Sequence, residues 1–321
     1  MLFLGFAPVF GAIANNEFSF SHLAVLFIIG ILTHIFGFVQ NDYYDGEIDS
    51  KSKYVSSRPI PAGCISKKTA FIIFTSSLMI SLILAIVFLF SFVSFSFLLF
   101  SFLCMGFYNK YSKRFFGMEY ILSMGVFTLG IFGALTVSNS ISSLAIIVSL
   151  LGFMQWLFSV GISANLKDVE FDSKLGIRTT PRVFRVHVSD KKLVIPLSFD
   201  FYAFTIKSIH IIIATLPFFL GYTSIFIYYL PIPGICFIFI SIILFYLTFK
   251  ILSTPLKERD KILIYIGLQE GLAFLLIPVT LMSFLTEKIS LLAIFLLILI
   301  LILWPIFWFR FLFGKRMIPL E

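Results

Sequence analysis

The chain has 321 residues, of which 60% are hydrophobic and only 12% are charged, and its formal net charge is +8. Soluble domains carry about 25% charged residues, so this composition excludes an ordinary soluble protein and indicates a polytopic membrane protein. No basic segment is interleaved with aromatic residues in a soluble stretch, so nucleic-acid binding is not indicated.

Apolar runs separated by polar segments predict an all-α, polytopic transmembrane helical bundle. The expected spans are residues 1–15, 22–41, 69–90, 92–108, 117–137, 142–164, 208–228, 232–250, 262–284 and 289–312. The first span is short, so we expect that it is stabilised by packing or that the chain starts upstream of Met1. We predict a single membrane-embedded domain over residues 1–321. Its first six helices and their loops reach about residue 192, and its remaining helices occupy about 208–312.

The positions of Lys and Arg predict how this bundle is oriented. All of them except Lys288 lie in the loops after the even-numbered helices, at the helix ends flanking those loops, or in the C-terminal tail. Short cytoplasmic loops retain positive charge, so we expect both termini to be cytoplasmic. The excess of Lys and Arg either results from this topology alone or includes side chains that bind an anionic substrate.

The second predicted helix ends in an acidic segment, residues 41–49 (NDYYDGEID). If the helix continues through this segment, Asn41, Asp45 and Asp49 lie at i, i+4 and i+8 on one face. Three oxygen ligands would then form a stripe at the cytoplasmic membrane surface.

The sixth predicted helix ends in a similar way. Asn165 is followed by Asp168 and Asp172, which are again four residues apart. Like charges at this spacing destabilise a helix, so each cluster is either a solvated helix end or a site for a cation. Mg²⁺ binds through carboxylates together with substrate phosphates, and two facing clusters would hold Mg²⁺ ions with a diphosphate between them. A site for a cation, unlike a solvated helix end, explains why two similar clusters lie at cytoplasmic helix ends.

The residues around both clusters resemble the UbiA superfamily of intramembrane prenyltransferases. The pattern NDxxDxxxD at 41–49 is followed by RPIPAG at 58–63, similar to the family's Arg-Pro-x-x-x-Gly extension. The pattern DxxxD at 168–172 is followed by Gly176 and by TTP at 179–181. The resemblance extends from the first helix to about the ninth. It implies nine to ten helices around a central cavity, with a polar cap over the cytoplasmic mouth and a lateral opening to lipid.

The resemblance also implies roles for individual residues. The expected Mg²⁺ ligands are Asn41, Asp45, Asp49, Asp168 and Asp172, of which the four aspartates are the expected catalytic residues. Further expected contacts to the substrate come from Asn41, Asp42, Arg58, Tyr108, Lys113, Asn165 and Lys167.

The implied activity is Mg²⁺-dependent transfer of a polyprenyl group from its diphosphate to a lipophilic or aromatic acceptor in the bilayer. Mg²⁺ and cationic side chains would stabilise the departing diphosphate, and the acceptor would capture the prenyl cation. The segments NDYYD and RPIPAG resemble members that use C20-type donors, such as chlorophyll synthases and archaeal ether-lipid synthases. Prenylation of a quinone precursor stays open as an alternative.

Two features differ from the family pattern. Members usually carry an Arg in or just before the first helix, whereas this chain has no basic residue before Lys51, which fits a truncated start or an altered diphosphate pocket. The tenth predicted span exceeds the usual nine, so the C-terminal region is expected to be a subgroup addition.

Several other residues have both a functional and a structural interpretation. His34 shares a helix face with Asn41 and is either a proton acceptor or a packed histidine. Gln155 is either a substrate ligand or a helix–helix contact. Glu270 is an intramembrane carboxylate and therefore a candidate functional residue, unless it is paired or reaches the surface. Aromatic candidates for contact with the allylic cation are Tyr43, Tyr44, Tyr108 and Tyr111.

A non-catalytic alternative is a transporter whose acidic clusters coordinate a coupling ion. Transporter sites usually lie near the bilayer midplane at broken helices, whereas both acidic clusters are predicted at helix ends. The sequence therefore favours the enzyme over the transporter.

Overall fold

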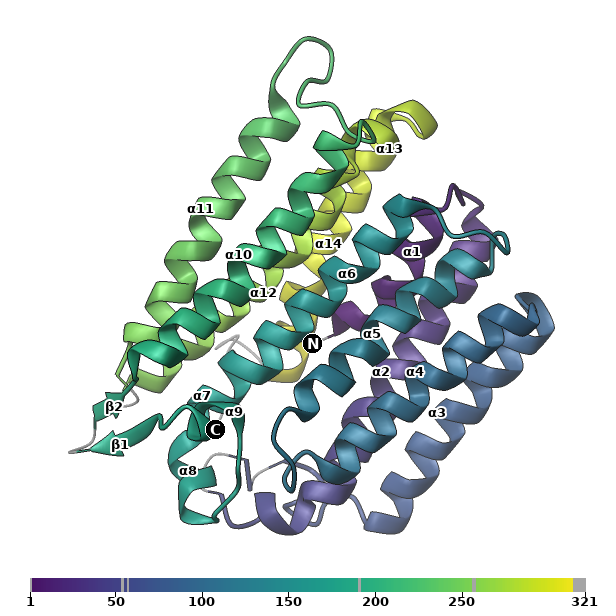
Figure 1. Cartoon of the computed structure of the whole chain (residues 1–321). Coiled ribbons are helices and arrows are strands. Elements are labelled where there is room, and N and C mark those ends of the chain that lie inside the picture. The colour runs from purple at the N-terminus through teal and green to yellow at the C-terminus, as the bar shows by residue number, and fades with distance from the viewer. Residues whose placement is uncertain (1, 53–54, 57, 190–191, 256–257, 314–321) are drawn as a thin grey trace. The chain divides into compact units, whose positions relative to one another are not determined.

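The computed structural model describes residues 2–52, 55–56, 58–189, 192–255 and 258–313, and most of them are helical (Figure 1). Within these ranges, eight helices are long and apolar enough to cross a membrane. Contacts divide the chain into two compact units, residues 1–149 and 150–320, and the boundary falls inside helix α6 (Ser143–Phe158). The predicted helical membrane bundle is thus confirmed. The central cavity, the polar cap and the single domain stay predictions.

The first unit contains a short N-terminal pair of helices and four long ones. In chain order these are η1 (Leu2–Phe6), α1 (Ala7–Ala14), α2 (Phe20–Asp49), α3 (Lys67–Phe88), α4 (Phe92–Tyr111) and α5 (Met118–Leu135), followed by the first part of α6. A Cβ atom on Gly11 of α1 would overlap the carbonyl oxygen of Gly130, and one on Gly133 of α5 would overlap that of Pro8. Small residues allow such close helix contacts in membranes. The short first span is therefore held by packing on α5.

The second unit begins with the rest of α6, which continues as a π-helical stretch, η2 (Ser159–Ala164). Its other elements are α7 (Asn165–Lys167), α8 (Val169–Lys174), α9 (Thr180–Val183), β1 (His187–Ser189), β2 (Lys192–Val194), α10 (Leu197–Phe219), α11 (Ile232–Ser253), α12 (Arg259–Thr280), α13 (Met282–Lys288) and α14 (Leu291–Phe313). The two strands form an antiparallel hairpin in which Ser189 pairs with Lys192.

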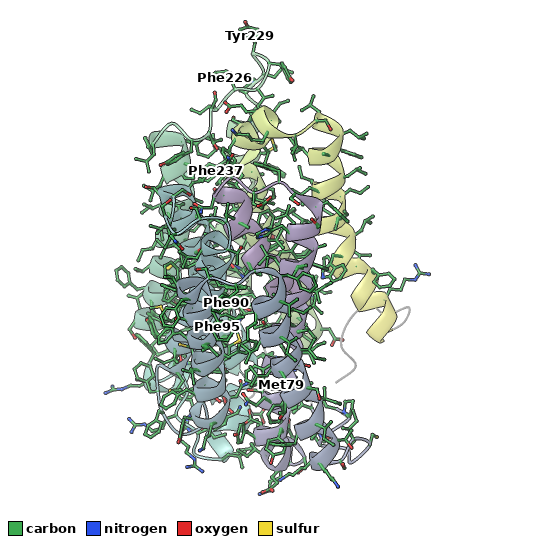
Figure 2. The ribbon with its side chains drawn as sticks, turned by 90° about the vertical axis from the view of Figure 1, so that its right-hand side faces the viewer. Met79, Phe90, Phe95, Phe226, Tyr229 and Phe237 are labelled. Atoms are coloured by element: carbon green, nitrogen blue, oxygen red, sulfur yellow. The ribbon has the colours of Figure 1, made fainter. Side chains whose placement is uncertain are left out.

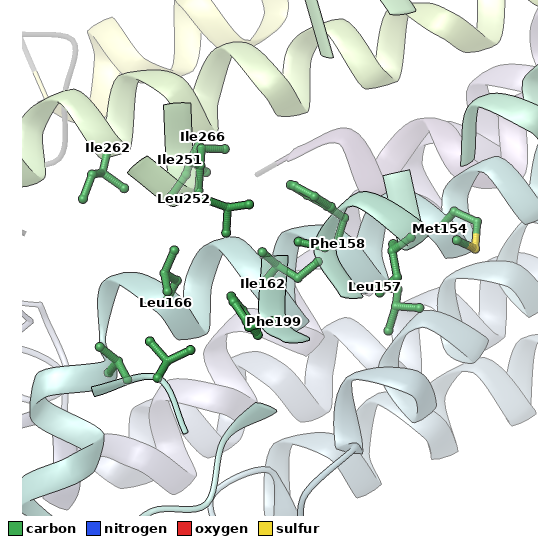
Figure 3. Packing of buried hydrophobic residues seen from close by; sticks show 14 residues of the cluster. Met154, Leu157, Phe158, Ile162, Leu166, Phe199, Ile251, Leu252, Ile262 and Ile266 are labelled. Carbon is green, nitrogen blue, oxygen red and sulfur yellow. The ribbon is translucent and has the colours of Figure 1, made fainter. Parts of the chain in front are cut away.

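A buried apolar cluster packs the helices of the second unit around the end of α6 (Figure 3). Phe158, Ile162 and Leu166 are each 0% exposed, and so are Phe199 of α10 and Ile262 of α12. In lipid there is no hydrophobic driving force between helices, so this cluster is held by close van der Waals packing. This cluster therefore fixes the segment that leads into the second acidic motif.

Most predicted spans match the observed helices, but the span at 208–228 was wrong. Helix α10 covers Leu197–Phe219, and its first half contains Asp200 and Lys207, which made that half look like a loop. The apolar chain after Phe219 forms a long connection instead, because Tyr228 and Tyr229 reverse it with φ angles of 48° and 65°. Figure 2 shows Tyr229 at the tip of this connection, where its side chain is 98% exposed.

Candidate functional site

The first acidic cluster lies on the last turns of α2, which stays helical to Asp49. Asp45 and Asp49 are 5% and 7% exposed, and Asn41 donates a hydrogen bond from Nδ2 to Asp45 Oδ2 (3.4 Å). Carboxylates are almost never this buried unless they are paired or bind a cation. The predicted stripe of Asn41, Asp45 and Asp49 on a continuous helix is thus present at the end of α2, and its role as a set of metal ligands stays a prediction.

The carboxylates of this cluster interact unfavourably with the dipole of α2. The C-terminal end of a helix carries partial negative charge, yet residues 42–49 add four carboxylates there, and no basic residue lies in the last turn. Arg58 lies against them, with Nη1 3.4 Å from Asp42 Oδ1 and 3.8 Å from Asp49 Oδ2. Lys67 Nζ is 2.5 Å from Glu47 Oε1. Negative charge accumulates at this helix end, and nearby cations only partly offset it.

The end of α4 is fixed to α2 next to this cluster. Asn109 donates hydrogen bonds to the carbonyl oxygen of Gly37 and to Oε1 of Gln40, both 2.9 Å long. Gln40 immediately precedes Asn41, so the segment that carries Tyr108 and Lys113 lies at the same end of the first unit as the acidic stripe. The segments that carry the predicted site residues of this unit thus lie at one of its ends.

The second acidic cluster lies where the helix breaks. The helix that begins as α6 passes through the π-helical stretch and α7, and it is interrupted at Asp168 before α8 starts at Val169. Asp172 lies in the first turn of α8 and is 1% exposed. The N-terminal turn of a helix favours negative charge. Asp168 and Asp172 are therefore held by a break in the helix and not by one continuous face.

Two arginines that sequence reasoning did not select hold this segment. Arg259, the first residue of α12, donates from Nη1 to the carbonyl oxygen of Lys167 and from Nη2 to Asp168 Oδ1 (3.0 Å). Arg182 donates from Nη1 to the carbonyl oxygens of Asp172 (3.2 Å) and Ile177 (2.7 Å). Both are among the basic loop residues from which we predicted the orientation, and that pattern does not separate them from solvated cations.

The donor atoms of both clusters suit Mg²⁺. Within the described ranges, no group of three or more His, Cys, Asp or Glu side chains is placed to hold a metal ion. Mg²⁺ does not need such a group, because it usually binds through one or two carboxylates, substrate phosphates and water. Each cluster offers carboxylate oxygens and an amide oxygen, which fits a metal that is bound together with a diphosphate.

The other candidate residues differ in their surroundings. His34 is 9% exposed, and its ring centroid lies 4.2 Å from that of Phe38. Tyr43 packs on Phe74 with centroids 5.5 Å apart, and Tyr111 packs on Phe107 at 4.7 Å. These two tyrosines therefore contribute to aromatic packing at the ends of α2 and α4.

Gln155 and Glu270 both make contacts inside the second unit. Gln155 exchanges hydrogen bonds with Gln269 of α12, at 3.3 and 3.1 Å, so the predicted helix–helix contact is confirmed. Glu270 accepts a hydrogen bond from Ser159 Oγ. Neither residue is part of the second acidic cluster.

Comparisons with known proteins agree on one family. The sequence model of the UbiA prenyltransferase family matches residues 2–263. A segment of 66 residues is 35% identical to a 4-hydroxybenzoate octaprenyltransferase of Marinomonas sp. (strain MWYL1) and covers 20% of this chain. The match spans only 23% of the length of that relative.

Two solved structures are similar in fold. One is from work on digeranylgeranylglyceryl phosphate synthase in membranes, with a TM-score of 0.59, 18% identity and coverage of 88% of this chain and 94% of that chain. The other is a UbiA homolog from Archaeoglobus fulgidus bound to GPP and Mg²⁺, with a TM-score of 0.60, 18% identity and coverage of 88% and 95%. These likenesses establish the fold of the chain.

Proposed function

Because this chain belongs to the UbiA prenyltransferase family, we propose that it transfers a prenyl group from its diphosphate to a lipophilic or aromatic acceptor. The observation that carries the proposal is the pair of buried carboxylates, Asp45 and Asp49, at the negative end of α2. A negative helix end that adds further carboxylates attracts divalent cations. Similar solved structures include one bound to GPP and Mg²⁺.

In this proposal, the residues of the two acidic clusters hold the metal and the diphosphate. As the resemblance to the family implies, the proposed Mg²⁺ ligands are Asn41, Asp45 and Asp49 in the first cluster and Asp168 and Asp172 in the second. When bound, Mg²⁺ would neutralise charge on the departing diphosphate. The enzyme would contribute positioning and electrostatics, with no covalent nucleophile.

The basic residues beside each cluster would orient the diphosphate. Arg58 already lies within 3.8 Å of two carboxylates, so a diphosphate would share its guanidinium with them or displace them. Bidentate bonds from a guanidinium to phosphate suit this position. Lys113 and Lys167 would add charge, and Tyr108 and Asn165 would add hydrogen bonds.

The donor that we propose is a C20-type prenyl diphosphate, and the acceptor is lipophilic. The resemblance of NDYYD and RPIPAG to enzymes with such donors supports this choice. The fold is also similar to the structure from work on digeranylgeranylglyceryl phosphate synthase. The chain is a multi-pass membrane protein, and its basic loops support a cytoplasmic position for both acidic clusters.

The direct test is donor turnover by the purified chain in lipid nanodiscs. Radiolabelled geranylgeranyl diphosphate is supplied with a lipid extract as the source of acceptor, and released diphosphate and prenylated lipid are both measured. We expect both products with Mg²⁺, none after addition of EDTA, and recovery when Mg²⁺ is restored. Equal labelling with and without Mg²⁺, or no turnover of any prenyl diphosphate, would contradict the proposal and favour a non-catalytic membrane protein.

A further inference from the structure

The connection between α10 and α11 is long, apolar and exposed. It covers residues 220–231, and we call it the aromatic connection. Figure 2 shows Phe226 and Tyr229 of this segment beyond the ends of the helices. Exposed apolar patches of this kind mark surfaces that bind a protein, a membrane or a ligand. The large exposed side chains of the aromatic connection include Tyr222, Ile225, Phe226, Tyr228, Tyr229 and Leu230.

The aromatic connection is held in place by hydrogen bonds to α12 and α13. The backbone N–H of Ser224 donates to Oγ of Ser283 (3.0 Å), and that hydroxyl donates to the carbonyl oxygen of Ser224 (3.1 Å). Oγ1 of Thr223 donates to the carbonyl oxygen of Thr280. The connection therefore has a defined conformation, and it lies at the same end of the second unit as the start of α13.

The aromatic connection also carries no charge. No Asp, Glu, Lys or Arg occurs between Lys207 and Lys250, so the helix ends on both sides of the connection are uncharged as well. The neighbouring turn from α13 to α14 is different, because Glu287 and Lys288 are exposed there. One end of the second unit thus combines a charged turn that suits water with a long connection that lacks charges.

The tip of the connection is a two-residue turn with an unusual sequence. Ile227 and Leu230 exchange two backbone hydrogen bonds of 2.9 Å, and Tyr228 and Tyr229 between them have φ angles of 48° and 65°. Positive φ at both central residues is typical of a type I′ turn, for which Asn-Gly is preferred. Bulky side chains are disfavoured at such angles. Turn geometry therefore does not account for the two tyrosines.

The aromatic rings at the tip do not pack against one another either. Phe226, Tyr228 and Tyr229 surround an open hollow of about 640 Å³. Within the described part of the chain, none of the three rings contacts another aromatic ring. Packing inside the chain therefore does not account for these side chains, and their rings are available to a partner outside it.

The bilayer is the partner that these observations favour. The chain is a multi-pass membrane protein, and α10 and α11 are both long and apolar enough to cross a membrane. The connection is continuous with the lipid-facing surfaces of these two helices. Tyrosine is enriched where membrane meets water, because its ring is apolar and its hydroxyl forms hydrogen bonds. A protein partner would instead be expected to meet a polar rim around the apolar centre of its site.

We propose that the aromatic connection lies in the membrane interface, with the rings of Phe226, Tyr228 and Tyr229 among lipid headgroups and the adjoining parts of the acyl chains. Irregular backbone exposed to lipid does not occur inside the hydrocarbon layer, so the interface is the region that the connection can occupy. The three rings anchor this end of the second unit to one leaflet. The inference is independent of the proposed activity, which depends on the acidic clusters.

The test measures whether lipid or water reaches the connection in the full chain in phosphatidylcholine vesicles. The three native cysteines are replaced, and a bimane label is attached to Leu230→Cys, which keeps all three rings. Glu287→Cys is the water-exposed control, and Ile242→Cys on the exposed face of α11 is the lipid-exposed control. We expect a lipid with a nitroxide near its headgroup to quench Leu230→Cys about threefold more than Glu287→Cys, and aqueous iodide to quench it about threefold less.

A second variant separates membrane anchoring from folding. Tyr228→Asn/Tyr229→Gly gives the turn its preferred sequence and removes two of the rings. Lipid quenching of the label at Leu230→Cys should then fall about threefold, because the apolar rings no longer hold the tip in the interface. Unchanged lipid quenching in this variant would show that the rings do not anchor the connection and would overturn the proposal.

Two results for the chain that keeps both tyrosines would overturn the proposal as well. If iodide quenches Leu230→Cys as strongly as Glu287→Cys, the connection lies in water. If the label at Leu230→Cys is protected from both quenchers, protein covers the connection, either a second copy of the chain or a different partner. Neither result would affect the proposed activity, which is measured separately by turnover of the prenyl donor.

Discussion

Arg259 donates to two successive residues of the second acidic motif, the carbonyl oxygen of Lys167 and the carboxylate of Asp168. Its side chain is 9% exposed, while that of Asp168 is 33% exposed. A planar guanidinium suits this double contact, and a lysine does not. Arg259 is therefore a positioning residue that connects the start of α12 to the acidic motif.

The first prediction concerns this contact. Arg259→Lys should lower prenyl transfer about 10- to 100-fold, the usual effect of removing a residue that orients a metal ligand. We expect a higher Mg²⁺ requirement together with the lower turnover, and a titration of activity against Mg²⁺ measures both. The control is Lys261→Ala, an exposed cation whose Nζ lies 2.6 Å from Glu258 Oε2. An unchanged Mg²⁺ titration for Arg259→Lys would refute the positioning role.

The second prediction concerns the acidic clusters themselves. Asp45→Ala and Asp172→Ala should each abolish prenyl transfer, because each removes a proposed metal ligand. Both variants should stay inserted and monodisperse. Asp45→Asn should fail as well, since the amide keeps the shape but loses the charge. Product formation is measured with labelled donor, and monodispersity is measured by size-exclusion chromatography. Activity above a few per cent of wild type in both alanine variants would contradict the metal assignment.

The third prediction separates two roles for Arg58. Arg58→Lys should raise the donor KM more than the acceptor KM, because lysine cannot make bidentate bonds to the diphosphate. The structure offers a control at the same helix end, Lys67→Ala, which breaks only the exposed pair with Glu47. Steady-state kinetics with each substrate varied in turn measure the effect. If Arg58 serves only as a cytoplasmic charge, the lysine variant will keep its donor KM and kcat.

The fourth prediction concerns sidedness. Ser140 should be extracytoplasmic, whereas Ser56 and Ser189 should be cytoplasmic, as the distribution of basic residues predicts. The three native cysteines, Cys64, Cys104 and Cys236, are first replaced, since Cys64 is exposed and would react. Single cysteines are then labelled with an impermeant maleimide from each side of sealed vesicles. Labelling of Ser140→Cys and Ser56→Cys from the same side would exclude the ten-span topology.

The sequence predicted the acidic stripe because its information is local. Asn41, Asp45 and Asp49 follow the helical repeat, and the polar end of a long apolar run marks their position. The start of α10 was missed because hydropathy treats Asp200 and Lys207 as loop residues, although Lys207 is fully buried beside polar partners. Hydropathy describes the average environment of a residue type and not the partner that a particular side chain finds.

Arg259 could not be identified from the sequence either, and the reason is different. Its two acceptors lie about ninety residues earlier in the chain, and nothing in the local sequence distinguishes it from the neighbouring solvated Lys261. The same holds for Gln155, whose partner Gln269 lies more than a hundred residues later in the chain. Pairings of this kind depend on how the helices pack in space, which single-sequence patterns do not encode.

The π-helical stretch has a geometric consequence for the second unit. A π-turn holds one residue more than an α-turn, and one residue in an α-helix corresponds to a rotation of about 100°. Residues 165–168, up to the break in the helix, are therefore turned by roughly a quarter of a circle relative to a regular continuation of α6. Relative to Ser159, Asp168 thus projects in a different direction from the one that it would have in a regular helix of this sequence. Deleting a single residue from 159–164 would redirect Asp168 while leaving every side chain of the acidic motif chemically intact.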